Sequence, residues 1–266
     1  MLDALGADIL CLLETKAQPS DITDDMVLVP GWDSYFSFAK FRMGYSGVAI
    51  YTRLGVCRPL RAEEGVTGIL DSRICPGTPC KHLSAAEVIG GYPELSDAAA
   101  FLLDSEGRAI ALDFGAFVLL AVCCPDGGSR DRDAFRQAFV HALLCRIQNL
   151  IAQGRHVVLA GGLNVTRHNI DVADTQNFVL NTSPADWEFR VRLRRLLEPH
   201  PNALMSDLCR EHFSGTLSIR LSFPSSKPRR VVLIMADLQI GMLRRTRGRG
   251  MPVCVLPPPH SPTKLT

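Results

Sequence analysis

The sequence predicts a mixed α/β sandwich, and three observations support this fold class. Short apolar runs of strand length alternate with two segments of helical periodicity. Two of the predicted strands, residues 109–114 and 117–124, follow each other directly and form a hairpin around Gly115. Hydrophobic residues make up 47% of the 266 positions, which is ample for a core. Paired neighbouring strands combined with strand–helix alternation favour a sandwich over a simple parallel α/β fold.

The first hundred residues contain three predicted strands and a long connection. Residues 7–14 (ADILCLLE) form a short apolar run that ends in an acid, as in a buried strand. Residues 33–39 have the alternation of a strand, and residues 47–53 (GVAIYTR) form a third one. Residues 58–96 contain many Gly, Pro and Cys with weak periodicity, which indicates a long connection.

Two helices are predicted in the second half of the chain. Residues 131–153 place apolar side chains on one face at steps of three or four, and Gly154 ends the helix. A second helix opens at Ser183, the expected N-cap, with Pro184 in its first position, and runs to about Leu197. Between the two helices lies a further apolar strand, residues 156–160 (HVVLA).

The sequence divides into an α/β domain over residues 1–214 and a basic, Pro-rich tail over residues 215–266, predicted to be disordered. From Arg210 to the end there are ten Lys and Arg against two acids, so the last 57 residues carry a charge of about +8. The first 209 residues carry about −6. This asymmetry fits either a nucleic-acid-binding tail or a segment not shaped by folding.

The cysteine pattern and the N-terminus favour an intracellular protein that is not secreted. The nine cysteines include no C-x-x-C pair, which suits a reducing compartment. Asp3 and Asp8 interrupt the N-terminus before the apolar region of a signal peptide can form. No stretch approaches the length of a membrane span, so we expect no membrane partner.

Three segments carry residues suited to phosphate chemistry, and each has an ordinary structural explanation as well. Glu14 ends a buried strand, where a carboxylate either binds a cation such as Mg²⁺ or simply faces solvent. The Gly-Gly-Leu-Asn turn ending at Asn164 lets a phosphate approach backbone N–H groups, or is a plain strand-to-loop turn. Residues 44–47 (GYSG) allow close backbone contact with a ligand, or form a hairpin turn. None of the three specifies a function alone.

Read in order, seven segments match one known family in register. They are ADILCLLETK, MVLVPGWDSYFSFAKFRMGYSGVAIYTR, RAEEGVTGIL, IGGYPELSD, LDSEGRAIALDFGAFVLLAVCCP, HVVLAGGLNVTRHNID and MSDLCREHF. Over roughly residues 4–213 the chain resembles class II AP endonucleases of the exonuclease III family, and within them the fungal branch of AP endonuclease 2. Such a long collinear match is more specific than any single motif.

The resemblance implies a four-layered α/β sandwich of the deoxyribonuclease-I-like (endonuclease/exonuclease/phosphatase) type. It implies Mg²⁺- or Mn²⁺-dependent hydrolysis of the DNA backbone 5′ to abasic sites in base excision repair, with possible 3′ phosphodiesterase or exonuclease activity. DNA with abasic sites would be the partner, and the nucleus the location. The sliding-clamp contact of the family is not evident in this sequence, and neither is its zinc-binding module.

The resemblance also implies roles for individual residues. Glu14 matches the metal-binding glutamate, and Asn164 matches the catalytic asparagine of the family's G-D-L-N motif. Four residues are expected to contact DNA or its phosphates, the first of them also supporting the Glu14 carboxylate: Lys16, Tyr45, Arg167 and His168.

Several family positions are vacated. The aspartate of G-D-L-N, which activates or positions the attacking water, is Gly162, and the tyrosine of V-Y-x-P is Cys123. The glutamine beside the metal-binding glutamate is Leu13. The first-strand asparagine and the C-terminal R-I-D-Y and S-D-H segments are not found, so the fold is expected to be incomplete at both ends. Because a positioned base contributes about 10²–10⁴ in rate, impaired catalysis is expected.

Two functions therefore remain open at the level of sequence. The first is an AP endonuclease with impaired turnover. The second is a catalytically inactive remnant, or a fragment with mispredicted ends, that at most binds DNA non-specifically through its basic tail. A third class, phosphodiesterases that act on lipids, inositol phosphates or RNA tails, is disfavoured because residues 26–53 resemble the DNA-repair branch.

Overall fold

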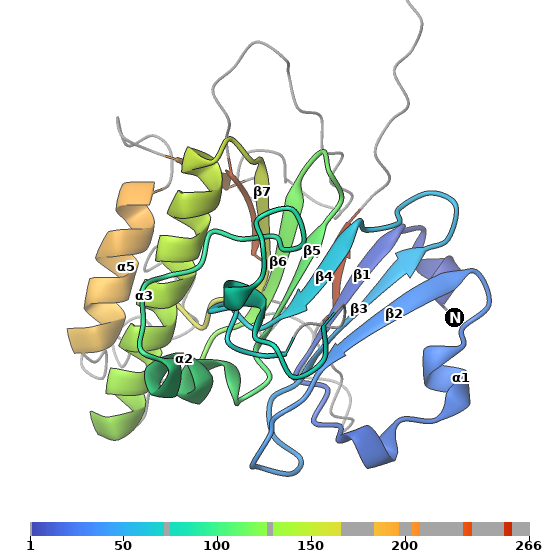
Figure 1. Ribbon diagram of the computed structural model, residues 1–266, viewed down its shortest axis with the longest axis horizontal. Coiled ribbons are helices and arrows are strands. Elements are labelled where there is room, and N and C mark those ends of the chain that lie inside the picture. Colours follow the sequence, from blue (N-terminus) through green and yellow to red (C-terminus); the bar gives the residue numbers. More distant parts are fainter. Residues whose placement is uncertain are drawn as a thin grey trace, which may run out of the picture.

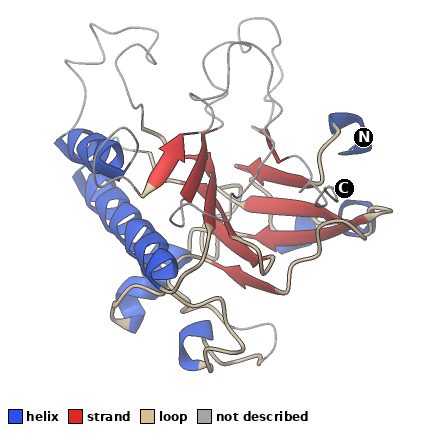
Figure 2. Ribbon diagram, turned by 90° about the horizontal axis from the view of Figure 1, so that it is seen from above, coloured by secondary structure: helices blue, strands red, loops and turns tan. Residues whose placement is uncertain are grey.

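Two β-sheets packed face to face form the centre of the molecule, with helices on the outer sides (Figures 1 and 2). The computed structural model describes residues 2–71, 75–126, 130–165, 184–196, 204–207, 231–235 and 253–256. Within these residues, no helix is both long enough and apolar enough to cross a lipid bilayer.

The smaller sheet has four antiparallel strands in the order β10-β1-β3-β2. Its strands are β1 (Ile9–Leu13), β2 (Trp32–Ser37), β3 (Val48–Arg53) and β10 (Val253–Leu256). The three strands predicted near the N-terminus are confirmed, with ends shifted by one or two residues.

The larger sheet has six strands in the order β4-β5-β6-β7-β9-β8. Its strands are β4 (Arg61–Glu64), β5 (Ala109–Asp113), β6 (Val118–Cys123), β7 (Val157–Gly162), β8 (Met205–Asp207) and β9 (Val231–Met235). The pairs β4–β5 and β5–β6 are antiparallel, whereas β6–β7, β7–β9 and β8–β9 are parallel. The sheet is therefore mixed, and the predicted hairpin around Gly115 is confirmed.

The helices lie on the outer faces of the two sheets. The longer ones are α2 (Asp97–Asp104), α3 (Arg130–Ala152) and α5 (Pro184–Leu196), and both predicted helices are confirmed as α3 and α5. Both α3 and α5 lie on the same side of the six-stranded sheet (Figure 1). Short turns of helix belong to the N-terminal part of the chain and to the long connection: η1 (Leu2–Leu5), η2 (Pro19–Asp21), α1 (Asp24–Val27) and η3 (Cys80–His82).

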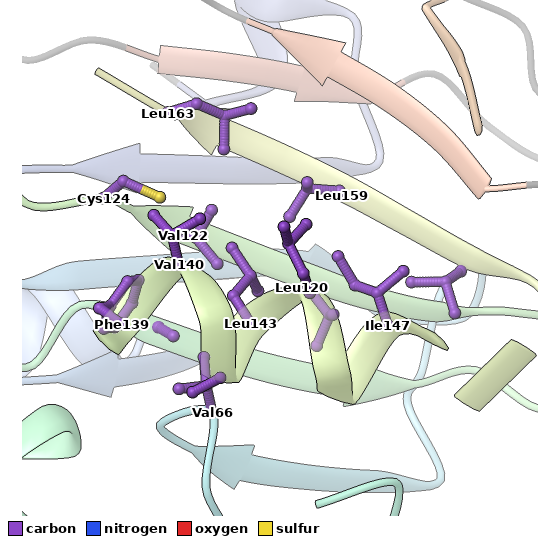
Figure 3. Close-up of a cluster of buried hydrophobic side chains, with 14 of the residues drawn as sticks. Val66, Leu120, Val122, Cys124, Phe139, Val140, Leu143, Ile147, Leu159 and Leu163 are labelled. Carbon is purple, nitrogen blue, oxygen red and sulfur yellow. The ribbon is translucent and has the colours of Figure 1, made fainter. Parts of the chain in front are cut away.

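The main core lies between α3 and the six-stranded sheet (Figure 3). The helix buries Phe139, Leu143 and Ile147 at steps of four residues, as its periodicity predicts. Strand β6 is buried on both faces, and its alternate residues Leu120 and Val122 face the helix. The members of this core shown in the figure include Val66, Leu120, Val122, Cys124, Phe139, Val140, Leu143, Ile147, Leu159 and Leu163.

A second core joins the two sheets, and a third covers the outer side of the smaller sheet. The second contains Ile9, Cys11 and Leu13 of β1 with Leu119, Ala121 and Cys123 of β6, together with Val48, Ile50, Ile110, Leu112, Val158 and Ala160. The third includes Leu10, Trp32, Ala49 and Tyr51, with Leu2 and Val29 packed on them. The four layers are the helices α3 and α5, the six-stranded sheet, the four-stranded sheet and an outer layer of short helices. Together they make the predicted α/β sandwich.

Part of the predicted tail contributes strands. Strand β9 pairs with β7 and β8 in the larger sheet, and β10 pairs with β1 in the smaller one. The expectation of disorder therefore does not hold for 231–235 and 253–256. These runs, VVLIM and VCVL, are apolar and β-branched, which suits strands, but their short length gave no periodic signal. The other residues of the predicted tail lie outside the described residues, so the boundary at residue 214 stays a prediction.

The buried carboxylate of Asp113 is expected to make the stability of the fold depend on pH. This carboxylate accepts hydrogen bonds from Arg155, from Arg61 at 3.0 Å and from the backbone of Gly115 at 2.8 Å. Burial opposes its charge, but these hydrogen bonds and the charge of Arg155 prevail and hold the pKa of Asp113 below its ordinary value of 3.8. A lowered pKa contributes stability above the unfolded-state pKa, and this stability is lost as the pH falls through the folded-state pKa.

We therefore expect the melting temperature to fall on acidification from about pH 5 to about pH 3, and to fall less steeply in Asp113→Asn. Thermal melts followed by circular dichroism across this range measure both slopes. Asp113→Asn also removes the negative charge and one of the two acceptor oxygens that Arg61 and Arg155 share, so its melting temperature should be lower at neutral pH. Parallel pH profiles for the two proteins would show that Asp113 does not carry this dependence.

Candidate active site

The candidate site lies where the ends of β1, β6 and β7 come together. In the parallel pairing of β6 and β7, Cys123 stands opposite Gly162. A Cβ atom added to Gly162 would lie 3.7 Å from Cδ1 of Leu13, the last residue of β1. The backbone of Glu14, the next residue along the chain, lies close enough to the Cys123 thiol to influence its pKa. Four positions selected from three distant sequence segments are therefore neighbours in space.

Glu14 stands in a segment of unusual backbone conformation. Its φ is +52°, and that of Lys16 is +54°, in the left-handed region that residues other than glycine rarely occupy. The Lys16 Nζ atom lies 3.5 Å from Glu14 Oε2, and both side chains are partly exposed. Such backbone outliers cluster at functional sites, which supports a role for this segment.

Backbone hydrogen bonds hold this segment against the loop that precedes β3. Thr15 N donates to Gly47 O at 3.2 Å, and Lys16 N donates to Ser46 O at 2.8 Å. Gly47 has a φ of +91°, and a Cβ there would lie 2.3 Å from the Thr15 Oγ1 atom, so glycine is required. The Gly-Tyr-Ser-Gly segment thus runs beside the candidate metal-binding glutamate.

Asn164 lies two residues after the end of β7. It is exposed, and its φ of +50° is again left-handed. Its side-chain Nδ2 donates to Cys124 O at 2.5 Å, while its own backbone carbonyl accepts a hydrogen bond from Arg136 of α3. Both contacts fix the orientation of Asn164 before any ligand binds.

Cys123 is buried, and it is not a substitute for a phosphate-binding phenol. Burial, with the charges of Glu14 and Asp126 adding to it, raises the pKa of the Cys123 thiol to about 11. The group is therefore a neutral thiol near pH 7. A thiol is a weak hydrogen-bond donor, so Cys123 provides neither a nucleophile nor a strong phosphate contact.

The two glycines that end β7 have opposite steric surroundings. A Cβ on Gly161 would lie 2.0 Å from Val122 O, and the Gly161 φ is +125°, so only glycine fits. Among the described residues, the nearest atom to a Cβ on Gly162 is 3.7 Å away, an ordinary van der Waals distance, and the φ of Gly162 is not left-handed. The position that lacks the expected aspartate therefore has room for a side chain.

Tyr45 is held by two arginines that the sequence analysis missed. Arg108 Nη2 and Arg132 Nη2 each donate to the Tyr45 hydroxyl at 2.8 Å. Arg108 Nη1 also donates to Cys123 O at 3.0 Å, which links Tyr45 to the strand ends. No motif marks these arginines, because one precedes β5 and the other lies in the first turn of α3.

Glu106 pairs with both arginines, and the charge of Asp126 also acts on Arg132. The Glu106 carboxylate accepts hydrogen bonds from Arg132 at 2.6 and 2.8 Å and one from Arg108. Burial opposes its charge, but the two guanidinium groups outweigh this effect and lower the pKa of Glu106. Arg42 adds a third guanidinium group, 4.2 Å from the centre of the Tyr45 ring. This cluster carries a net positive charge.

The acidic residues at the site fit a cation only in part. Among the described residues, no three His, Cys, Asp or Glu side chains form a metal-binding group. Glu14 and Asp126 are both near enough for their charges to act on Cys123. Mg²⁺ commonly binds proteins through one or two carboxylates and completes its coordination with substrate phosphate and water. Glu14 therefore fits a metal that binds together with a phosphate.

The structure thus brings together most of the predicted site residues. Glu14, Lys16 and Tyr45 lie along two adjoining segments, and Asn164 lies at the end of β7 beside the vacated positions. The predicted DNA contacts Arg167 and His168 lie outside the described residues.

Comparisons with known proteins agree with this geometry. The sequence profile of the Endonuclease/Exonuclease/phosphatase family matches residues 1–231. The chain is 39% identical over 211 residues to the Schizosaccharomyces pombe protein "DNA-(apurinic or apyrimidinic site) endonuclease 2" and 34% identical over 188 residues to the Homo sapiens protein of that name. These alignments cover 77% and 66% of this chain, but only 40% and 34% of the relatives' own lengths.

A solved structure supports the same relationship. The Xenopus laevis APE2 catalytic domain superposes with a TM-score of 0.62 at 29% sequence identity, covering 79% of this chain and 65% of that one. The shared sandwich confirms the predicted fold class. With its fold, its sequence profile and its site geometry in agreement, this chain belongs to the Endonuclease/Exonuclease/phosphatase family.

Proposed function

We propose that this chain carries the catalytic fold of a DNA-(apurinic or apyrimidinic site) endonuclease and hydrolyses the DNA backbone 5′ to abasic sites at a reduced rate. The observation that carries the proposal is the meeting of Glu14 with the ends of β6 and β7 beside the Tyr45 loop. The names of the aligned relatives supply the substrate. The nucleus is the corresponding location, and 3′ phosphodiesterase or exonuclease activity is a related reaction.

The proposed cofactor is Mg²⁺, with Mn²⁺ as an alternative. Glu14 would hold the cation, and Lys16, 3.5 Å from its carboxylate, would keep that carboxylate oriented. A bound divalent cation supplies charge stabilisation at a phosphoryl oxygen. Asn164, pinned by Cys124 O and Arg136, would orient the phosphate or the attacking water, and the positive cluster around Tyr45 would attract the DNA backbone.

The reduced rate follows from the two vacated positions. Gly162 offers no proton acceptor where the family's aspartate is expected, and Cys123 is a buried neutral thiol in the place of a phenol. Loss of a positioned base costs about 10²–10⁴ in rate. Activity is therefore expected to need high enzyme concentration and long incubation.

Substitution of Glu14 tests the proposed metal-binding role. Glu14→Gln is expected to lower Mg²⁺-dependent nicking of an abasic-site duplex by about 10²-fold, because the carboxylate that holds the cation is lost. The measurement is strand cleavage on denaturing gels, with and without chelator. Glu94→Gln, an exposed glutamate of the long connection, is the matched control and should leave the rate unchanged. Equal nicking by Glu14→Gln and the parent protein would remove Glu14 from the mechanism.

A second candidate function is DNA binding without catalysis. The lack of the family's aspartate at Gly162 and of its tyrosine at Cys123 favours this function. It predicts salt-sensitive, sequence-independent binding with no turnover at any Mg²⁺ concentration. Because β9 and β10 belong to the sheets, deletion of residues 215–266 would also damage the fold. Replacement of the basic run at residues 244–249 by serine is the cleaner test. Unchanged binding and salt dependence in that variant would exclude this basic run as the DNA-binding element.

A further inference from the structure

Two large apolar side chains project from the loop between β2 and β3. Phe41 is 79% exposed and Met43 is 81% exposed, and they flank Arg42. Phe101 and Leu102 of α2 extend the apolar surface, since Phe41 contacts Phe101 edge to face with ring centroids 5.8 Å apart. Single exposed apolar residues are ordinary, but a contiguous group beside a functional site indicates a contact surface.

Backbone contacts hold the start of this loop in place. Lys40 N donates to Ser105 O at 2.7 Å, and Lys40 Nζ lies 2.7 Å from Glu64 Oε1. Gly107 packs so closely against the backbone of Phe38 that an added Cβ would lie 2.3 Å from its carbonyl carbon. The backbone just before Phe41 is therefore held in place. Little conformational freedom of the loop would be lost when the exposed Phe41 side chain contacts a ligand.

The apolar group is continuous with the candidate active site. The Arg42 guanidinium stacks on the Tyr45 ring, and Ser46, the next residue, accepts a hydrogen bond from Lys16 N beside Glu14. Among the described residues, the three guanidinium groups of Arg42, Arg108 and Arg132 at the Tyr45 ring outnumber the two acids near them, Glu106 and Asp126. A ligand with phosphates at Tyr45 and an apolar, flat group at Phe41 and Met43, four and two residues earlier in the loop, would match this surface. A DNA strand with an unstacked base has this arrangement.

We propose that Phe41 and Met43, with Phe101 packed against Phe41, form a base-contacting surface. This surface would stack against an unstacked nucleotide next to the abasic site, while Arg42 and Tyr45 face the phosphate of that nucleotide. This inference rests on the proposed function, because it takes DNA as the substrate. Aromatic side chains bind bases through stacking that is tolerant of sequence, and apolar side chains also wedge between base steps of distorted duplexes. A missing base removes stacking partners from its neighbours, which favours such a contact.

The test uses the full chain and a duplex with a tetrahydrofuran abasic-site analogue and 2-aminopurine at a neighbouring position, in Ca²⁺ to limit turnover. Phe41→Ala is expected to weaken binding by about 5- to 100-fold in fluorescence anisotropy and to abolish the change in 2-aminopurine emission. Phe41→Trp should retain both. Met43→Ala should show a smaller loss of the same kind.

Leu28→Ala is the matched control, because Leu28 is 71% exposed and lies after α1, away from the Tyr45 loop in the sequence and outside its contacts. It should bind as the parent protein does. If the parent protein binds DNA and Phe41→Ala shows the same affinity and the same 2-aminopurine signal, the base-contacting surface is overturned. The proposed function is left standing by that result. A parent protein that fails to bind any DNA would overturn both.

Discussion

Gly162→Asp is expected to raise the rate of abasic-site cleavage by about 10²–10⁴-fold, the contribution of a positioned general base. The substitution places a carboxylate at the end of β7, opposite Cys123 and beside the last residue of β1. The carboxylate would stand between the strand end that precedes Glu14 and the segment that carries Asn164. The substitution restores only the aspartate position, while Glu14 and Asn164 are already present and the position of Cys123 stays without its tyrosine.

The structure indicates that this side chain can be accommodated. Within the part of the chain that the structure describes, the nearest atom to a Cβ on Gly162 is Leu13 Cδ1 at 3.7 Å, and the position is only partly buried, so the carboxylate can remain hydrated. By contrast, Gly161→Ala places a Cβ 2.0 Å from Val122 O at a φ of +125°. We expect Gly161→Ala to be destabilised by at least about 1–3 kcal/mol, whereas Gly162→Asp should melt near the parent temperature.

The variant Gly162→Asn distinguishes the effect of a proton acceptor from the effect of side-chain size. Asparagine has the size of aspartate but accepts no proton at neutral pH, so it should give little of the gain. Single-turnover cleavage in Mg²⁺ measures the three proteins side by side, and addition of Glu14→Gln to Gly162→Asp should remove the gain. A folded Gly162→Asp protein with the parent rate would show that Gly162 is not where the missing base belongs.

The local elements of the fold could be predicted because each has a strong local signal. The apolar steps of α3, the run that forms β1 and the turn at Gly115 all depend on residues close together in the sequence. Strands β9 and β10 were not predicted, because each is only four or five residues long and its place in a sheet depends on partners distant in the sequence, β7 and β8 for β9 and β1 for β10.

The candidate site was predictable only in part, for a similar reason. Glu14 and Asn164 follow buried strands and were found from that position. Arg108 and Arg132 were missed, because their contacts with Tyr45 exist only after β5, α3 and the loop before β3 have packed together. The left-handed backbone at Glu14 gave no sequence signal either, since glutamate ordinarily avoids that conformation.

Arg146→Met is expected to lower the free energy of unfolding by about 3–5 kcal/mol, because it leaves the carboxylate of Glu63 buried without its partner. The Arg146 side chain is fully buried and that of Glu63 is 4% exposed. Arg146 of α3 pairs with Glu63 of β4 and donates to Gly65 O at 3.0 Å and to Gly90 O at 3.3 Å. One guanidinium group therefore ties both ends of the long connection to the helix.

Glu63 has further partners that a neutral residue would partly keep. Ile89 N donates to Glu63 Oε1 at 2.6 Å, and the Tyr92 hydroxyl donates to the same atom at 2.8 Å. The double variant Glu63→Gln with Arg146→Met should therefore recover part of the lost stability, since no isolated charge remains buried and glutamine still accepts these hydrogen bonds. Urea unfolding of the single and double variants measures the recovery directly.

An exposed ion pair on the neighbouring helix provides the matched control. Arg192 and Glu188 of α5 are separated by one turn, and their side chains are 44% and 49% exposed. Arg192→Met should cost no more than about 0.5 kcal/mol, because exposed pairs of this type contribute little. Equal losses in Arg146→Met and Arg192→Met would contradict the anchoring role of Arg146. A large difference would mean that α3, whose Arg132 and Arg136 orient Tyr45 and Asn164, is fixed from the opposite end by a single buried pair.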